Sequence, residues 1–364
     1  MSSFLLGCLA LGVVPLARAA APHPFEFPYG AYEPVPFHVS VDADFVEQTR
    51  QKAKTFRPTI DLLDGDVSNP GWVEGIPSAN LAALRDFWVD EFDWAGTEEE
   101  INGNFSHYAV TIPEIPNWPD EVPLHFIHET SEVEGAIPVL LLHGWPSTSL
   151  EWSKVIHELT APSDPDAPAF HVVAPDIPGF GFSPAPRYSG YGPQEMGHTF
   201  HLLMRQLGYE EYGIASTDLG WFAALFQVAL YPEAITGHFS DFWFLPPTAD
   251  DYERYANNQT SPVETGYITS FDLWIQHHNS YNLVHQGTPL SFAQSLNDSP
   301  VGFASWVWHL MNAVSNGFEY SLDEIIRDAF LLYVPGVFGN IRSYKEIFLV
   351  SQCLPKVFSV PSQC

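Results

Sequence analysis

Short apolar runs alternate with amphipathic segments along the middle of the chain. Runs rich in apolar and β-branched residues, bounded by turn residues, predict strands. The strands that we expect are 107–112, 123–129, 137–144, 170–176, 211–217 and 235–239. The run 137–142 is apolar throughout, which is typical of a strand covered on both faces.

Helical periodicity fills the segments before and between these strands. The expected helices are 44–53, 81–92, 150–159, 193–207 and 221–230. Strand–helix alternation predicts an α/β fold, with a doubly wound parallel sheet and helices on both of its faces. From 242 to 344 the strand signals fade and helix and loop signals dominate, which predicts an inserted helical lid.

The N-terminus has the pattern of a targeting segment. Its apolar run, 4–17, is short for a membrane span, and Ala17-Arg18-Ala19 matches a signal-peptidase site. We therefore expect a cleaved signal peptide over 1–19, no stable membrane span, and a protein that is secreted or enters the secretory-pathway lumen. Asn-X-Ser/Thr tripeptides predict glycosylation at Asn104, Asn258 and Asn297.

Charge and composition narrow the classes of partner. The 44 acidic residues against 14 Lys+Arg give a formal net charge of −30, which repels nucleic acid and favours a neutral small molecule. The 15% aromatic content fits either a large core or an apolar pocket. The pairs His198/His201 and His277/His278 lack further ligands at convincing spacing, so we expect neither metal nor cofactor. The oligomeric state stays open.

The residues with the clearest chemistry are Ser216-Thr217-Asp218-Leu219-Gly220. A buried strand, a turn of small residues and a helix meet here, as in a nucleophile elbow, which presents one exposed side chain. That side chain is Asp218, a carboxylate able to attack carbon and form an ester. We expect the helix N-terminus to keep Asp218 ionised. The alternative is that Asp218 only caps the helix.

Two further loops follow strands in the same order along the chain. His143-Gly144-Trp145-Pro146 comes after the most apolar strand, and 176–183 (DIPGFGFS) comes after the next one. The backbone N–H groups of Trp145 and Leu219 are candidates for an oxyanion hole, and we expect His143 to shape this turn rather than to act as a base. The ordered set predicts an α/β-hydrolase.

These motifs resemble the microsomal-type epoxide hydrolase family. HGWPST, DIPGFGFS and the Asp218 elbow carry the resemblance, together with the segments FWVDEFDW, LHFIHE and SLNDSPVGFASWV, at 87–94, 124–129 and 295–307. It covers roughly 35–346. It implies that an epoxide of a hydrophobic small molecule opens through an ester on Asp218. It also implies two lid tyrosines that assist ring opening: Tyr344 in IRSYKE and Tyr281, with Tyr267 as a rival for the second place.

The chain departs from the family pattern near its C-terminus. The family's charge-relay acid and its His after the last strand are not found, and no His follows His309. We therefore expect the last strands to be missing from this sequence, as in a truncated or misread gene product, with hydrolysis of the ester impaired. The expected domains are a signal peptide (1–19), a meander with the first strands (20–130), the hydrolase core (131–241), the lid (242–345) and a divergent tail (346–364).

Three other functions fit the same residues. A haloalkane dehalogenase shares the Asp nucleophile, although Leu219 stands where such enzymes usually carry Trp. A non-catalytic or impaired binding protein would explain the missing His. An epoxide-opening cyclase would yield a ring ether instead of a diol. The substrate of the leading interpretation is a hydrophobic epoxide, of a lipid or of secondary metabolism.

Overall fold

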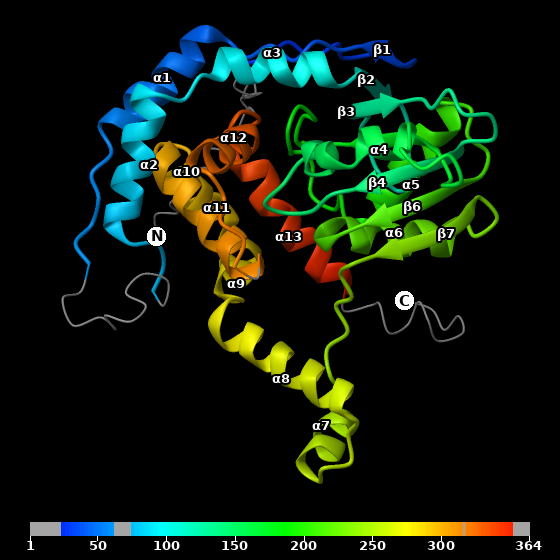
Figure 1. The fold of residues 1–364 in the computed structure, drawn as a ribbon. Coiled ribbons are helices and arrows are strands. Elements are labelled where there is room, and N and C mark those ends of the chain that lie inside the picture. Colours follow the sequence, from blue (N-terminus) through cyan, green and yellow to red (C-terminus); the bar gives the residue numbers. More distant parts are fainter. Residues whose placement is uncertain (1–22, 62–73, 316, 352–364) are drawn as a thin grey trace, which may run out of the picture.

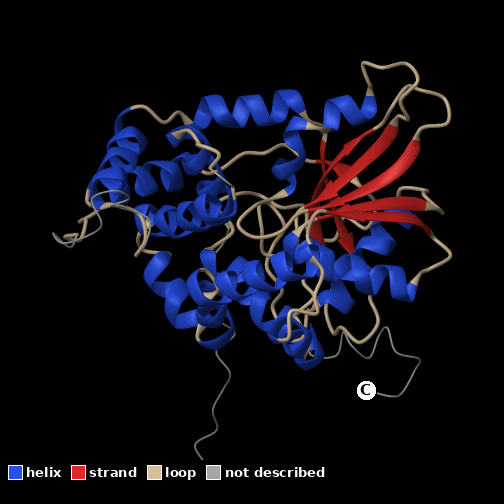
Figure 2. Cartoon of the chain, turned by 60° about the horizontal axis from the view of Figure 1, so that its bottom comes forward, coloured by secondary structure: helices blue, strands red, loops and turns tan. Residues whose placement is uncertain are grey.

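The computed structural model describes residues 23–61, 74–315 and 317–351. The signal peptide expected over 1–19 and the three cysteines lie outside these residues. Within them a sheet occupies one side of the molecule and most of the helices gather on the other (Figure 2).

The described sheet has seven strands in the order β1-β2-β3-β5-β4-β6-β7. Their bounds are β1 Val35–Pro36, β2 His107–Ile112, β3 Val122–Glu129, β4 Ile137–Leu142, β5 Phe170–Pro175, β6 Tyr212–Ser216 and β7 Ile235–Ser240. The six predicted strands are present. The expected parallel sheet is wrong for half of it, because β1, β2, β3 and β5 pair in antiparallel fashion. A short connection between β2 and β3 permits only the antiparallel arrangement.

The helices begin and end close to the predicted bounds, with two exceptions. They are α1 Ala43–Lys54, α2 Ser78–Asp90, α3 Trp94–Asn104, α4 Ile156–Thr160, α5 Pro193–Gln206, α6 Asp218–Leu230, α7 Ala249–Ala256, α8 Pro262–His277, α9 Ser280–Gly287, α10 Pro289–Leu296, α11 Pro300–Val314, α12 Leu322–Tyr333 and α13 Val337–Ser351. The helix expected over 150–159 is instead a 3₁₀ helix, η1 (Ser149–Lys154), followed by α4. Helix α3 has no apolar periodicity in its acidic middle, so the pattern did not indicate it.

The parallel part of the sheet positions the site. Strand β4 lies between β5 and β6, and Leu142 is in register with Ser216 at their carboxyl ends. Helix α6 packs against β4, β6 and β7 and against α5, which itself contacts β2, and Leu140, Val173 and Ile214 lie in the buried core. The loops that follow β4 and β6 therefore leave the sheet side by side.

The N-terminal helices pack on the lid (Figure 1). Contacts join α1 to α11, and α2 to both α11 and α12. One lid residue, Phe330 on α12, has ring contacts with Phe45, Trp88 and Trp94 from the three N-terminal helices. This buried aromatic cluster fixes the α11–α12 part of the lid to the N-terminal segment.

Helix α13 connects the lid to the sheet (Figure 1). It contacts α9 and α10 at the lid and α5 and α6 at the core. The domain boundary expected between 345 and 346 falls inside this helix, because Ile341, Tyr344 and Ile347 continue one buried face. None of the helices in the described ranges is long and apolar enough to cross a membrane.

Candidate active site

Asp218 lies at a sharp bend between β6 and α6. Its φ is +42°, in the left-handed region that side chains other than glycine rarely adopt. Thr217 occupies the N-cap position, so the alternative of Asp218 as a simple cap is wrong. The bend needs glycine at 220, where a Cβ atom would lie 2.5 Å from the Leu142 carbonyl oxygen. The strained backbone presents the Asp218 carboxylate to the space beyond the sheet.

Two backbone N–H groups bind the Asp218 carboxylate. Trp145 N–H donates to Oδ1 at 2.9 Å, and the Leu219 N–H also stabilises the anion. The predicted oxyanion-hole groups therefore lie at this carboxyl group. Gly144 lies against it so closely that a Cβ atom there would be 2.3 Å from the Asp218 Cβ.

Burial changes the acidity of Asp218 more than the helix N-terminus does. Loss of solvation raises the pKa of Asp218 to about 6, and Asp241 adds to the rise, while the N–H groups of Trp145 and Leu219 oppose it. We expected the helix N-terminus to favour the ionised form, and the Leu219 N–H does act in that direction, although burial has the larger effect. The carboxyl group is nevertheless mostly ionised at pH 7.

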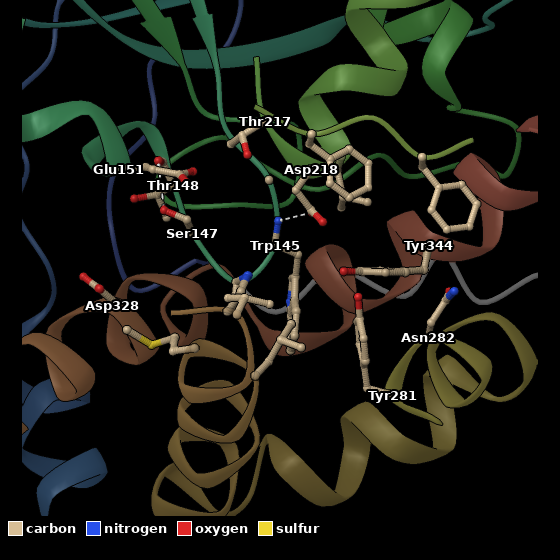
Figure 3. Close-up of a pocket in the computed structure, with 18 of the residues that line it drawn as sticks. Trp145, Ser147, Thr148, Glu151, Thr217, Asp218, Tyr281, Asn282, Asp328 and Tyr344 are labelled. Carbon is tan, nitrogen blue, oxygen red and sulfur yellow. Dashed lines mark hydrogen bonds between the residues drawn. The ribbon is translucent and has the colours of Figure 1, made fainter. Parts of the chain in front are cut away.

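Two tyrosines from the lid side face Asp218. Tyr281 comes from α9 and Tyr344 from α13, and their hydroxyl groups point toward the same part of the cavity (Figure 3). Their ring centroids are 5.6 Å apart. Burial raises the pKa of both phenols, and the charge of Asp218 raises both further. Both groups are therefore protonated donors across the neutral pH range.

The Tyr344 hydroxyl is buried and makes no hydrogen bond of normal geometry among the described residues, but it interacts with the Tyr281 hydroxyl beside it. Buried polar atoms nearly always have good partners in native proteins, so the pair of phenols indicates a place for a ligand oxygen. The rival Tyr267 differs, because its hydroxyl donates to the backbone carbonyl of Leu245 at 2.9 Å. The structure therefore brings Tyr281, and not Tyr267, together with Tyr344.

The loop after β4 is held in place by its own side chains. The His143 Nε2 accepts from the Ile177 N–H at 3.0 Å, and its Nδ1 donates to the Gly144 carbonyl at 3.0 Å. Burial lowers the pKa of His143. This fully buried imidazole ties two loops together, in agreement with the expected shaping of the turn. The next peptide bond, Trp145–Pro146, is cis.

Trp145 also contacts both tyrosines. Its indole stacks on the Tyr281 ring at 5.7 Å between centroids and meets the Tyr344 ring edge-to-face at 6.0 Å. The indole Nε1–H donates to Oδ1 of Asn340 on α13 at 3.0 Å. One side chain thus connects the loop that binds Asp218 to the helices that carry the phenols.

These groups line one cavity of about 670 Å³. Its apolar side is aromatic and is formed by Phe222, Phe242, Phe244, Phe271, Trp274 and Phe348. The acids Glu151, Glu324 and Asp328 also line the cavity, and Glu151 and Asp328 lie on the side away from Tyr281 and Tyr344 (Figure 3). Sequence reasoning did not identify these acids. For Glu151, the one signal in the sequence was a charged residue placed between the apolar Leu150 and Trp152, within the predicted helix 150–159.

Glu151 has the most perturbed carboxyl group of the three. Its exposed surface faces the cavity, and the surrounding protein raises the pKa of Glu151 to about 8. Loss of solvation is the main cause, and the charges of Asp218 and Asp241 add to it. The Gly144 backbone N–H and the Ser147 hydroxyl act in the opposite direction.

The remaining predicted positions lie away from this cavity. The side chains of Asn104, Asn258 and Asn297 are all exposed. His198 Nδ1 and His201 Nδ1 pair with the hydroxyls of Tyr231 and Tyr212, which gives both imidazoles structural partners. Over the described part of the chain, no group of three or more His, Cys, Asp or Glu residues is arranged to hold a metal ion.

Comparison with known families and proteins follows the division of the chain. Residues 34–152 match the family model "Epoxide hydrolase N terminus", and residues 137–241 match "alpha/beta hydrolase fold". A Stigmatella aurantiaca protein that carries a provisional epoxide hydrolase name is 30% identical over 240 residues, which are 65% of this chain and 52% of that protein. Juvenile hormone epoxide hydrolase of Manduca sexta is 27% identical over 77% of this chain and 61% of its own length.

Solved structures agree with the observed fold. Juvenile hormone epoxide hydrolase from Bombyx mori superposes with a TM-score of 0.74 at 22% identity, over 86% of this chain and 77% of that one. Aspergillus niger epoxide hydrolase gives 0.74 at 21% identity, over 92% and 84%. The chain thus spans about half the length of the bacterial relative and larger shares of the others.

Proposed function

Because this chain belongs to the epoxide hydrolase family and has the α/β-hydrolase fold, we propose that it opens the epoxide ring of a hydrophobic small molecule. One observation carries the proposal: the Asp218 carboxylate faces the buried hydroxyls of Tyr281 and Tyr344 in one cavity. A nucleophile and a proton donor on opposite sides of a strained ring are what epoxide opening requires.

The first step forms an ester. The Asp218 carboxylate attacks one ring carbon, the bond from that carbon to the ring oxygen breaks, and its electron pair moves to the oxygen. Hydrogen bonds from Tyr344 and Tyr281 stabilise the developing alkoxide. The alkoxide then takes one proton from one of these phenols, and solvent reprotonates that phenol. Water next hydrolyses the ester, and the N–H groups of Trp145 and Leu219 stabilise the oxyanion.

The substrate that we propose is apolar and of moderate size. A cavity of about 670 Å³ with an aromatic side favours a bulky hydrocarbon body around the epoxide. An aromatic terminal epoxide such as styrene oxide is therefore a suitable first probe. A lipid epoxide or an epoxide of secondary metabolism belongs to the same chemical class.

Product analysis with this probe tests the proposal. We expect a diol, or an intact-protein mass increased by one epoxide, with the added mass located on Asp218 by peptide mapping. The variant Asp218→Asn should give neither product nor adduct while remaining folded. Release of a cyclic ether, or halide release from a haloalkane in place of epoxide opening, would replace this proposal with one of the two rival enzymes. An absence of any reaction at Asp218 would favour a binding protein.

We further propose that the protein enters the secretory pathway and carries N-linked glycans. The support is the apolar run and cleavage pattern before residue 20 and the exposed side chains of Asn104, Asn258 and Asn297. Expression in a secreting eukaryotic host with N-terminal sequencing and glycosidase treatment tests this. An intracellular product that keeps residue 1 and whose mass is insensitive to the glycosidase would contradict it.

A further inference from the structure

We propose that His285, on α9, is a positioning residue that holds the Tyr344 phenol in the orientation that opening of the epoxide requires. This inference rests on the proposed function and concerns its first step. His285 is fully buried, and it is not among the described residues that line the cavity. It therefore acts on the substrate only through the rings that it contacts.

The Tyr344 hydroxyl depends on its ring for its position. It makes no hydrogen bond of normal geometry among the described residues, so the packing of the ring must set its direction. The ring contacts Trp145, Tyr281, His285 and Phe348. The contact with His285 is the shortest of these four, at 4.8 Å between centroids, compared with 5.6 Å to Tyr281 and 5.9 Å to Phe348.

Four rings at the site contact one another in every pair. The His285 centroid lies 4.9 Å from that of Trp145 and 5.5 Å from that of Tyr281. The pairs among Trp145, Tyr281 and Tyr344 are 5.6 to 6.0 Å apart. The His285 plane is inclined to the other three by between 77° and 85°, the edge-to-face geometry that aromatic pairs favour. Tyr344 therefore cannot turn far in this cluster unless His285 moves.

His285 is itself held by α11. Its Nε2 accepts a hydrogen bond from the Trp306 Nε1–H at 3.0 Å. An indole N–H only donates, so the proton of the neutral imidazole lies on Nδ1. Burial lowers the pKa of His285 to about 3, and the acceptor at Nε2 is therefore present throughout the neutral pH range. Because α11 is joined to the N-terminal helices, this hydrogen bond connects the phenol to the fixed part of the lid.

The polar character of His285 fits positioning better than core packing. Its Nδ1 is buried and makes no hydrogen bond among the described residues. An apolar side chain would fill a purely structural position without leaving a buried N–H unpaired. The imidazole combines an acceptor for Trp306 with an N–H group among aromatic rings, which accept such donors weakly. The side chain is thus explained by what it holds rather than by the space that it fills.

Positioning of the phenol should affect the chemical step more than binding. The Tyr344 O–H must lie within hydrogen-bond distance of the ring oxygen as the alkoxide develops. A displacement of about 1 Å at a site of this kind can slow a reaction by up to about a hundredfold. Loss of His285 leaves the aromatic side of the cavity, formed by residues such as Phe222, Phe242 and Phe244, unchanged.

Single-turnover experiments with styrene oxide, read by intact-protein mass spectrometry, separate these effects. We expect His285→Leu, which has no acceptor for Trp306, to lower the maximal rate of ester formation at least about tenfold, while the concentration that gives half of that rate changes less than about threefold. His285→Gln, whose side-chain oxygen can accept from the Trp306 Nε1–H, should restore the maximal rate to within about threefold of wild type.

A second background shows whether His285 acts through Tyr344. In Tyr344→Phe, which has no hydroxyl to position, we expect His285→Leu to slow ester formation by less than about threefold. Residues that act through one group have non-additive effects, whereas a general loss of structure would slow both backgrounds equally. If His285→Leu does not fold, His285→Asn, whose shorter side chain cannot reach Trp306, gives the same comparison.

His198→Leu is the matched control for the loss of a buried imidazole. His198 lies on α5, and its Nδ1 is 2.6 Å from the Tyr231 hydroxyl, away from the cavity. We expect this variant to melt at a lower temperature and to form the ester within about twofold of the wild-type rate.

The results that would overturn the proposal are distinguishable from failure of the proposed function. If His285→Leu forms the ester as fast as wild type, is no slower than His285→Gln, or loses the same factor in the Tyr344→Phe background, His285 does not position the phenol, although the proposed function stands. If the wild-type protein forms neither an adduct nor a diol, the proposed function fails and this role fails with it.

Discussion

Trp145 and Asn340 are joined by a hydrogen bond from the indole Nε1–H to Oδ1 at 3.0 Å, although 195 positions separate them in the sequence. The Asn340 amide in turn donates to the Leu332 carbonyl at 3.0 Å. All three groups are deep in the protein. The loop that binds the nucleophile and the helix that carries Tyr344 are therefore held as one unit.

Replacing Asn340 tests this unit. Asn340→Ala leaves the Trp145 indole N–H and the Leu332 carbonyl without their partner, and an unpaired buried polar group costs about 1–3 kcal/mol. We expect the free energy of unfolding in urea to fall by that amount and ester hydrolysis to slow, because the Trp145 N–H is less well positioned. The exposed substitution Asn257→Ala should change stability by no more than about 0.5 kcal/mol. Equal stability of the two variants would contradict the arrangement.

The phenol groups should affect the first chemical step only. Tyr344→Phe and Tyr281→Phe remove proton donors, and we expect each to slow ester formation roughly a hundredfold. Stability should change little for Tyr344→Phe, since its hydroxyl makes no hydrogen bond of normal geometry. Rapid-quench kinetics and thermal melting measure the two effects, and Tyr267→Phe is the matched control. Unchanged ester formation in Tyr344→Phe would remove the phenol from the mechanism.

Ester formation should depend on the ionisation of Asp218. Only the carboxylate attacks carbon, and burial raises the pKa of this group to about 6. The rate of adduct formation should therefore rise with pH between about 5 and 7 and level off above, with a midpoint near 6. Single-turnover rates across this range measure it. A midpoint near 4 would show that Asp218 is far better solvated than its surroundings indicate.

The same burial should make Asp218 unfavourable for folding. Its pKa is higher in the folded state than in the unfolded chain, so its charge destabilises the fold at pH values above about 6, and the effect disappears as the pH falls toward 4. Asp218→Asn should stabilise the protein by about 2–3 kcal/mol at pH 8 and by almost nothing at pH 4, since the pKa shift is roughly two units. Urea unfolding at the two pH values tests this. A gain that does not change with pH would have another cause.

The contact between the lid and the N-terminal segment should be a major source of stability. Phe330 is fully buried among three aromatic rings, and Phe→Ala in such a site typically costs 3–5 kcal/mol. We expect Phe330→Ala to unfold at lower urea concentration and to lose activity through displacement of α12. Phe318→Ala, at an exposed position, is the control. A small effect of Phe330→Ala would mean that the lid is held mainly by α13.

The strands and the elbow could be predicted because short-range pattern determines them. A fully apolar run such as 137–142 and the S-T-D-L-G turn carry their own signals, and His143, Trp145, Asp218 and Leu219 follow from the order of the loops. The antiparallel half of the sheet did not follow, because apolar runs carry no information on strand direction. Strand direction can be inferred only from the length of the connection between two strands.

The site could be predicted only in part for a related reason. Tyr281 and Tyr344 were identified through resemblance, since no local pattern distinguishes them from the other tyrosines. The cavity acids Glu151, Glu324 and Asp328 were missed because they come from separate segments that meet only in the folded cavity. The raised pKa of Asp218 could not be predicted, because desolvation is a property of the folded cavity and not of the helix end.

Helices α7 and α8 differ from the rest of the lid in how little they bury. No residue of α7 is buried, and Ile268 alone is buried in α8, whereas α11 and α12 are joined to the N-terminal helices. Of the two, α8 lines the cavity, through Tyr267, Ser270, Phe271 and Trp274. Substitutions on this sparsely buried wall can alter which molecules enter, and how quickly they leave, without displacing the phenols or the nucleophile, so selectivity in this protein can diverge independently of its chemistry.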